Sequence, residues 1–383
     1  MSHGLRINGG SALVDGAFVD TAIDVDHGHI AAIGAERGAG RTLDAQGLLV
    51  LPGIVDIHGD AFERQLMPRP GVHFPAAVGL KDSDRQAIAN GITTVFHGVT
   101  ASWEPGLRSI DNARAIVDQV ARLKGELAAD TRLHLRYETF NLEAEAEIAE
   151  WMAERRIDML GFNDHMIWEN TPPRVRKLSQ MAERAGISAE EFLALVERLR
   201  ARADQVPAAT DRLAAVARQA GVPTLSHDDM SPEQRRWFRV RACRVSEFPT
   251  TIATAEDAFA AGDDVVLGAP NVVRGGSHVG WINAAEMVGR GCCTVLASDY
   301  YYPAPLIAAF RLAADKVAPL AQAWSLVSGN AARAAKLADR GALAPGLRAD
   351  AILVDAAAPA HPAVVATIVG GRLVHLAAPD RLH

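Results

Sequence analysis

The feature that most constrains the fold is a repeated alternation of short apolar segments with helical segments between residues 51 and 300. Such alternation favours a parallel sheet covered by helices, and eight apolar segments suit a (β/α)8 barrel better than an open sheet. The eight expected strands lie in VLPGIVDIHGD, GITTVFHGV, TRLHLRYE, IDMLGFND, GVPTLSHDD, CRVSEF, DVVLGAP and CCTVLASD.

The two ends of the chain have a different pattern, with short strand candidates joined by Gly/Asp turns. We therefore expect a small β-sandwich domain formed by residues 1–50 together with 341–383, and a catalytic barrel over 51–340. The connection over 170–221 is unusually long and carries helical charge patterning. We expect it to cap the barrel mouth or to extend a βα loop.

Composition narrows the class of protein. The net charge of −7 argues against a nucleic-acid-binding protein, and no apolar stretch approaches the length of a membrane span. The first ten residues do not resemble a signal peptide. The three cysteines (Cys243, Cys292 and Cys293) are too few and too badly spaced for a disulfide framework. These features fit a cytoplasmic enzyme with reduced cysteines, and they leave the oligomeric state open, a homo-oligomer included.

Acids and histidines gather at the ends of the expected strands. Because the carboxyl ends of barrel strands meet at the mouth that carries the active site, we expect these side chains to lie together. His58 and Asp60 end the first strand, and alternation places them on one face with Asp56. The candidates at the strand ends are His58, Asp60, Glu138, His165, His227 and Asp299.

Each of these residues alone has a structural explanation, since a single histidine at a strand end is more often hydrogen-bonded than metal-bound. Together they predict a metal centre, because crowded buried acids and histidines are costly without a cation. Imidazole and carboxylate ligands suit Zn, Mn or Fe. Six ligands exceed the needs of one zinc ion, so one or two divalent metal ions are expected.

Several motifs carry a resemblance to a known family. LPGIVDIHGD, GITTV and GALAPGLRADAILV resemble the amidohydrolase superfamily. HGDAFERQLMPRPGVHFP, RLHLRYE, LSHDD, EFPTT, LGAPNVVRGGSH and ASDYYYP are similar, in the same order, to the PhnM family of α-D-ribose 1-methylphosphonate 5-triphosphate diphosphatases. The resemblance implies hydrolysis of that phosphorylated sugar to the 5-phosphate and pyrophosphate. It also implies that all six residues at the strand ends are metal ligands, and that Glu138 replaces a bridging carboxylated lysine.

The expected chemistry is attack of a metal-activated water on the phosphorus nearest the ribose, with Asp299 as the catalytic base. An anionic substrate requires local positive groups on this acidic protein. We expect Arg69, Arg274 and His278 to bind the substrate, with backbone N–H groups around Gly275, Gly276 and Ser277 near phosphate oxygens. Arg64 is a further candidate cation, and Arg136 could bind phosphate or pair with Glu138.

The chain departs from the diphosphatase pattern in two segments. Val279-Gly280-Trp281 stands where the family has Ser-Gly-Asn, and His97 stands where it has an acid. The substrate could therefore be a relative of the family's own. Two alternatives stay open: an amide hydrolase, such as a deacetylase or cyclic amidase, and a non-catalytic scaffold relative. The expected phosphate-binding groups count against the first alternative, and the filled ligand positions count against the second.

Overall fold

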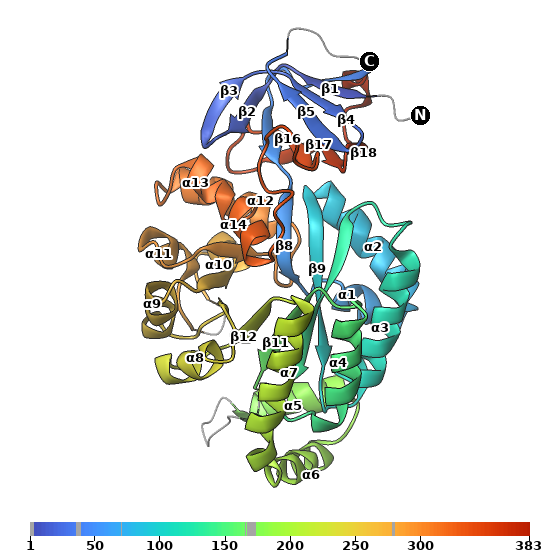
Figure 1. Ribbon diagram of the computed structural model, residues 1–383, viewed down its shortest axis with the longest axis vertical. Helices are drawn as coiled ribbons and strands as arrows, with labels where there is room; N and C mark the ends of the chain where they lie inside the picture. Colours follow the sequence, from blue (N-terminus) through green and yellow to red (C-terminus); the bar gives the residue numbers. More distant parts are fainter. Residues whose placement is uncertain (1–3, 36–39, 70, 165, 167–173, 278–279) are drawn as a thin grey trace.

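The computed structural model describes residues 4–35, 40–69, 71–164, 166, 174–277 and 280–383. Its centre is a sheet of eight parallel strands with helices between them, which confirms the barrel predicted from the sequence (Figure 1). In sheet order the strands run from the first to the last along the chain: β8 (Ile54–Gly59), β9 (Ile92–Ala101), β10 (Asp130–Glu138), β11 (Met159–Asn163), β12 (Thr224–His227), β13 (Val245–Glu247), β14 (Asp264–Gly268) and β15 (Val295–Ala297).

The barrel closes between its first and last strands, β8 and β15. At the end nearest the site, the Asp60 N–H donates to Asp299 O and the Asp299 N–H donates to His58 O, both at 2.9 Å. At the other end, Leu326 and Val327 lie between the two strands and accept hydrogen bonds from Leu296 and Val55 respectively. The barrel is therefore nearly closed, with a seam that depends on few hydrogen bonds.

Apolar side chains from the strands fill the barrel interior, among them Val55, Phe96, Met159, Leu225 and Val266. Helices cover the outside of the barrel (Figure 1). Their bounds are α1 Glu63–Leu66, α2 Ala76–Ala89, α3 Ile110–Leu123, α4 Glu145–Ala153, α5 Arg174–Ala185, α6 Ala189–Arg200, α7 Val206–Ala220, α8 Pro232–Arg239, α9 Ile252–Ala260, α10 Ala269–Arg274, α11 Ala284–Gly289, α12 Ala304–Ala314, α13 Leu320–Ser325 and α14 Gly329–Ala334.

Helix α3 shows how the sequence determines these elements. Its buried residues, which include Ile116, Val120 and Leu123, recur at helical spacing and so face the barrel. Ser109 caps the first turn by accepting a hydrogen bond from the Asn112 N–H at 3.2 Å. Helix α3 is therefore amphipathic, with its apolar face against the barrel and its polar face in solvent.

The two ends of the chain form two further sheets at one end of the molecule (Figure 1). Buried side chains from both sheets, such as Ile7, Ile23, Val50 and Leu353, form one core between them. The small β-sandwich is thus confirmed, whereas the domain boundaries at 50 and 341 stay predictions. Its strands are β1 Leu5–Asn8, β2 Ser11–Val14, β3 Ala17–Asp20, β4 Ile23–Asp26, β5 His29–Ile33, β6 Arg41–Asp44, β7 Leu49–Pro52, β16 Ala351–Asp355, β17 Ala363–Val369 and β18 Arg372–Leu376.

The long connection divides into two parts. Helices α5 and α6 extend the loop after β11 and share an apolar cluster with Trp103 and Phe140, which follow β9 and β10. Helix α7 instead contacts α4 on the outside of the barrel. Within the described part of the chain, no helix has the length and apolar character needed to cross a membrane.

Candidate metal centre

The first candidate ligands are His58, near the end of strand β8, and Asp60, the residue that follows this strand. The register of β8 against β9 shifts between Asp56 and Gly59, which breaks the simple alternation of side chains. Asp56 accepts hydrogen bonds from the Ser298 N–H (2.9 Å) and hydroxyl (2.6 Å), and burial raises its pKa to about 6. The prediction of one shared face was therefore wrong for Asp56, which is not among the side chains that gather around His58.

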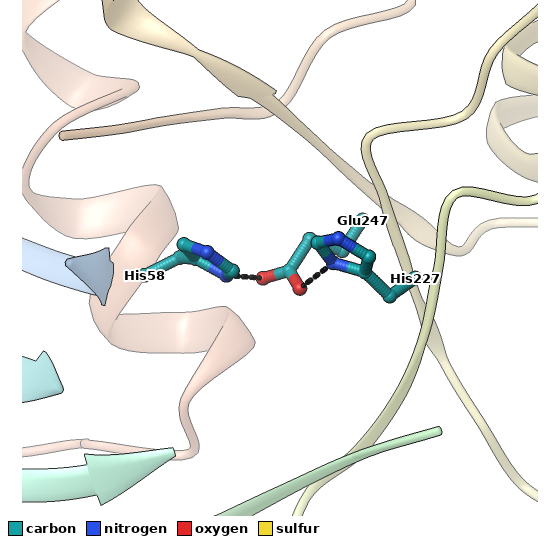
Figure 2. Close-up of side chains that lie close together, drawn as sticks. All are labelled: His58, His227 and Glu247. Carbon is teal, nitrogen blue, oxygen red and sulfur yellow. Dashed lines mark hydrogen bonds and ion pairs between the residues drawn. The ribbon is translucent and has the colours of Figure 1, made fainter. Parts of the chain in front are cut away.

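The structure places Glu247, the last residue of β13, between two predicted ligands (Figure 2). Its Oε1 lies 2.8 Å from His58 Nδ1, and its Oε2 lies 2.7 Å from His227 Nδ1. Sequence reasoning missed Glu247 as a ligand because it stands one residue before the end of the apolar run in CRVSEF. The available signal was its position in the EFP motif, on the strand after His227, with which it pairs in register.

The contact between His58 and Glu247 is short but is not a hydrogen bond. His58 Nδ1 and Glu247 Oε1 are buried, and neither makes a hydrogen bond of acceptable geometry to any residue that the structure describes. Burial raises the pKa of Glu247 to about 7 and lowers that of His58 to about 3. A divalent cation bound by both atoms would remove the cost of burying them unpaired, so these residues fit a metal ion.

A second group of candidate ligands shares His58 with the first. Among the described residues, ligand atoms of His58, Asp60 and Asp299 lie within 4.8 Å of one another, as do those of His58, His227 and Glu247. Burial, and secondarily the charge of Asp60, raises the pKa of Asp299 above its usual range. The two groups are candidate positions for divalent ions, and the expected number of one or two ions stays a prediction.

Three residues at the barrel mouth have a strained backbone conformation. Asp228, Phe248 and Asp299 each follow a barrel strand and have positive φ angles of 59°, 54° and 53°. Residues other than glycine rarely adopt this conformation unless their surroundings impose it, and it is common at functional sites. The turns aim side chains from three strand ends toward the candidate centre.

Arg136 is the buried cation of the site. Its Nη1 lies 3.7 Å from Asp60 Oδ2, and its Nη2 lies 2.9 Å from His227 Nε2. Because arginine can only donate, Nε2 of His227 carries the lone pair, which a bound metal ion would take in place of the arginine, and the Nδ1–H donates to Glu247. Arg136 therefore contacts the candidate ligands themselves, which neither of its two expected roles anticipated.

The remaining predicted ligands, Glu138 and His165, are not in either group of mutually close ligand atoms found among the described residues. Glu138 is buried at the C-terminal end of β10, but it belongs to neither group of mutually close ligand atoms, so its role stays a prediction. His165 lies outside the described residues. The ring of His97, one of the departures from the family pattern, packs 5.0 Å from that of Phe62 on the outer side of the barrel.

A cavity of about 210 Å³ opens onto the centre. Its lining includes His58, Asp60, His227 and Asp299, together with Ser277, Trp281 and Tyr300. Trp281 is one of the lining residues and keeps 41% of its surface exposed. Of the predicted substrate-binding residues, Ser277 lines the cavity and His278 lies outside the described residues. Val279, which departs from the family pattern, also lies outside them.

The two glycines before Ser277 have a structural role in this structure. The Gly275 N–H donates to Val272 O and the Gly276 N–H donates to Asn271 O, which ends helix α10 in a left-handed turn. These N–H groups do not point at the cavity, contrary to the expected phosphate contact, because the helix end uses them.

The predicted arginines lie at different distances from the cavity. Arg274 Nη1 donates to the Tyr300 hydroxyl at 3.4 Å, and the Arg64 guanidinium lies 6.0 Å from the centre of the Tyr300 ring. Both cations therefore flank a residue that lines the cavity. Arg69 is exposed and is not among the lining residues, so its contact with substrate stays a prediction.

An eight-stranded barrel that gathers histidines and carboxylates at its strand ends is an architecture that supports metal-assisted hydrolysis. The chain belongs to the amidohydrolase family, whose sequence model matches residues 49–374, and the protein is accordingly a hydrolase. It is 29% identical over 360 residues to the α-D-ribose 1-methylphosphonate 5-triphosphate diphosphatase of Escherichia coli (strain K12), covering 91% of this chain and 94% of that one. The expected resemblance is thus confirmed.

Solved structures show the same fold. A Xaa-Pro dipeptidase with bound methionine in its active site is 12% identical, with a TM-score of 0.67 over 97% of this chain and 100% of that one. The dihydropyrimidinase of Brevibacillus agri is 14% identical, with a TM-score of 0.61 over 97% and 95%. At these identities the likeness concerns the fold alone.

Proposed function

We propose that the protein is a divalent-metal-dependent diphosphatase. Its proposed substrate is α-D-ribose 1-methylphosphonate 5-triphosphate or a close relative, which it cleaves to the 5-phosphate and pyrophosphate. The observation that carries the proposal is the likeness to a diphosphatase over nearly the whole chain, found together with a cluster of acids and histidines at the barrel mouth. Members of the amidohydrolase family generally bind divalent metal ions, and Zn, Mn and Fe suit these ligands.

The residues around the cavity have separable roles in this reaction. When bound, the metal ion would acidify a water molecule and offset charge on the phosphoryl oxygens. His58, Asp60, His227, Glu247 and Asp299 would hold the metal, and Asp299 would also accept the proton of the attacking water. The raised pKa of Asp299 suits a proton acceptor that works near neutral pH.

The leaving pyrophosphate is anionic and needs cations near the cavity. Arg274 and Arg64 are suited to this role because both lie next to Tyr300, a residue of the cavity lining. Such cations favour a phosphoanhydride over the amide bond of the alternative hydrolases, which share the fold. A non-catalytic scaffold would not need the strand-end acids that this chain retains.

The test is hydrolysis of ribose triphosphates in ¹⁸O-labelled water by the metal-loaded protein. We expect one pyrophosphate per turnover, with the label in the sugar 5-phosphate because water attacks the phosphorus next to the ribose. Release of orthophosphate, or turnover of N-acyl or cyclic amides alone, would contradict the proposal. Asp299→Asn is the matched control: its turnover should fall about 10²–10⁴-fold, as loss of a general base does.

A further inference from the structure

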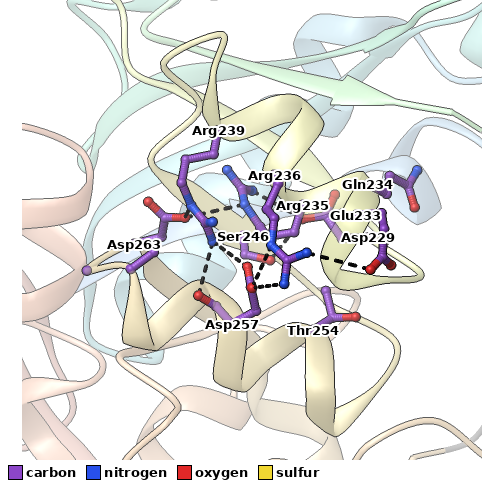
Figure 3. Close-up of polar contacts among 12 residues, drawn as sticks. Asp229, Glu233, Gln234, Arg235, Arg236, Arg239, Ser246, Thr254, Asp257 and Asp263 are labelled. Atoms are coloured by element: carbon purple, nitrogen blue, oxygen red, sulfur yellow. Dashed lines mark hydrogen bonds and ion pairs between the residues drawn. The ribbon is translucent and has the colours of Figure 1, made fainter.

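A network of ion pairs surrounds helix α8 (Figure 3), and its buried part links that helix to strands β12 and β13, which carry the candidate ligands His227 and Glu247. At its middle is Arg235, whose side chain is fully buried. It forms ion pairs with two buried acids, Asp229 at 3.1 Å and Asp263 at 3.4 Å. Neither acid lines the cavity, so the reaction itself does not explain why these charges are buried there.

One oxygen of Asp229 joins the two strands that carry His227 and Glu247. Asp229 Oδ2 accepts hydrogen bonds from the Ser226 hydroxyl at 2.6 Å, the Ser246 hydroxyl at 3.0 Å and Arg235 Nη1 at 3.1 Å. Ser226 precedes His227, and Ser246 precedes Glu247; the two serines also pair in the sheet register. Asp229 therefore links the two strands one residue before each candidate ligand.

Side-chain alternation makes this link relevant to the centre. In a strand, neighbouring side chains point to opposite faces, so the two serines lie on the outer face, opposite His227, which lines the cavity, and Glu247, which contacts His227. Arg235 Nη1 also donates to Val245 O at 3.2 Å, which holds the start of β13 against the same helix. A shift of either strand would therefore separate the imidazole from the carboxylate.

The main chain around Asp229 strengthens the link. The Thr250 N–H donates to Asp229 O, and the Asp228 N–H donates to Glu247 O, each at 2.9 Å. These bonds tie the turn after β12 to the end of β13. Buried ion pairs often contribute little net stability compared with apolar packing, whereas hydrogen bonds behind metal ligands commonly set the affinity for the metal.

We propose that Asp229, held by Arg235, is a positioning residue that fixes His227 relative to Glu247 through Ser226 and Ser246. This inference rests on the proposed function only in requiring that the centre bind a divalent metal. It predicts that weakening the link changes metal affinity and ligand geometry beyond any effect on stability.

The test compares Asp229→Asn with Asp263→Asn. Asp263 is a matched control because it is also buried and also forms an ion pair with Arg235. Its other ion-pair partners are Arg239 and Arg244, whereas the hydroxyls of Ser226 and Ser246 donate to Asp229. Zn²⁺ affinity is measured by competition with a chromogenic chelator, without substrate, and ligand geometry by the absorption spectrum of the Co²⁺ form. We expect about 10–100-fold weaker binding and an altered spectrum for Asp229→Asn, and less than about threefold weakening for Asp263→Asn.

A second variant, Ser226→Ala with Ser246→Ala, removes the links but leaves the ion pair with Arg235. It should also weaken Zn²⁺ binding, as Asp229→Asn does. If Asp229→Asn does not fold, this double variant still tests whether Asp229 positions the two ligands. Equal affinities for wild type and this double variant would overturn the positioning role, as would equal weakening in Asp229→Asn and Asp263→Asn. Wild-type protein that binds no divalent metal would instead overturn the proposed function.

Discussion

Glu247 is the residue whose burial is hardest to explain without a cation. Its carboxylate has no exposed surface and lies within 2.8 Å of an imidazole nitrogen on each side. An ionised carboxylate in such surroundings costs several kcal/mol unless opposite charge compensates it. Since burial lowers the pKa of His58 to about 3, that imidazole is neutral near pH 7 and does not supply the charge.

Glu247→Gln is therefore expected to lose most of its metal. The substitution keeps the size of the side chain but removes the charge and one ligand oxygen, so Zn²⁺ affinity should fall by at least about 100-fold. Glu138→Gln is the informative comparison, because the sequence pointed to Glu138 and the structure points to Glu247. Elemental analysis of both proteins after dialysis measures the difference. Full metal content in Glu247→Gln would remove Glu247 from the ligand set.

The raised pKa of Glu247 predicts a pH dependence. In the metal-free folded protein its pKa is about 7, above the ordinary value of 4.5, so the fold binds this proton more tightly than the unfolded chain does. Protonated Glu247 therefore makes a contribution to the free energy of unfolding that is constant below about pH 4.5. This contribution is lost as the pH rises from about 4.5 to about 7. Metal must displace the proton, so Zn²⁺ affinity should rise over the same window. Titrations at several pH values should show a shallower rise for Glu247→Gln.

Trp281 bears on substrate choice because it lines the cavity where the family has a small amide. An indole offers apolar surface and one donor, so a sugar hydroxyl that paired with the amide would lose that partner. Trp281→Asn should raise kcat/KM for the methylphosphonate triphosphate relative to other ribose triphosphates by about tenfold or more. Tyr301→Asn is the control, since Tyr301 is similarly exposed but does not line the cavity. An unchanged ratio between substrates would make Trp281 structural.

At the scale of elements, all eight barrel strands could be predicted from apolar runs because both faces of a parallel barrel strand are buried. The strand ends likewise indicated His58, Asp60, His227 and Asp299, which the structure brings to one mouth. The register shift in β8 could not be predicted, because pairing with β9 and not local sequence determines it. The hydrogen bonds of the Gly275 and Gly276 N–H groups could not be predicted either, because they depend on where α10 ends, which the sequence did not indicate.

The hairpin of α5 and α6 is an element whose stability should be separable from that of the barrel. Phe192, fully buried in its apolar cluster, packs against Trp103 with ring centroids 5.5 Å apart. Phe192→Ala should destabilise this packing by about 3–5 kcal/mol. We expect faster proteolysis within residues 174–200 and unchanged Zn²⁺ affinity, measured by limited digestion and chelator competition. A parallel loss of metal would show that the hairpin supports the centre.

At the scale of the whole molecule, the candidate centre joins the first and last strands of the barrel. His58 belongs to β8, Asp299 follows β15, and the seam between these strands depends on few hydrogen bonds. A metal ion bound by both residues would hold the seam from the cavity side. Metal binding and barrel closure should therefore be linked, because a ligand that binds only the folded state stabilises it.

Removal of the metal is expected to open this seam before it unfolds the barrel. At 100 times the dissociation constant, metal binding stabilises the fold by about 2.7 kcal/mol, so chelation should lower the Tm by several degrees. Hydrogen exchange should increase most at the Asp60 and Asp299 N–H groups, which close the seam. Amides between β9 and β10, such as that of Leu135, should keep their protection because that ladder lies away from the seam. Exchange that rises equally throughout the barrel, or a Tm unchanged by chelation, would show that the metal does not hold the seam closed.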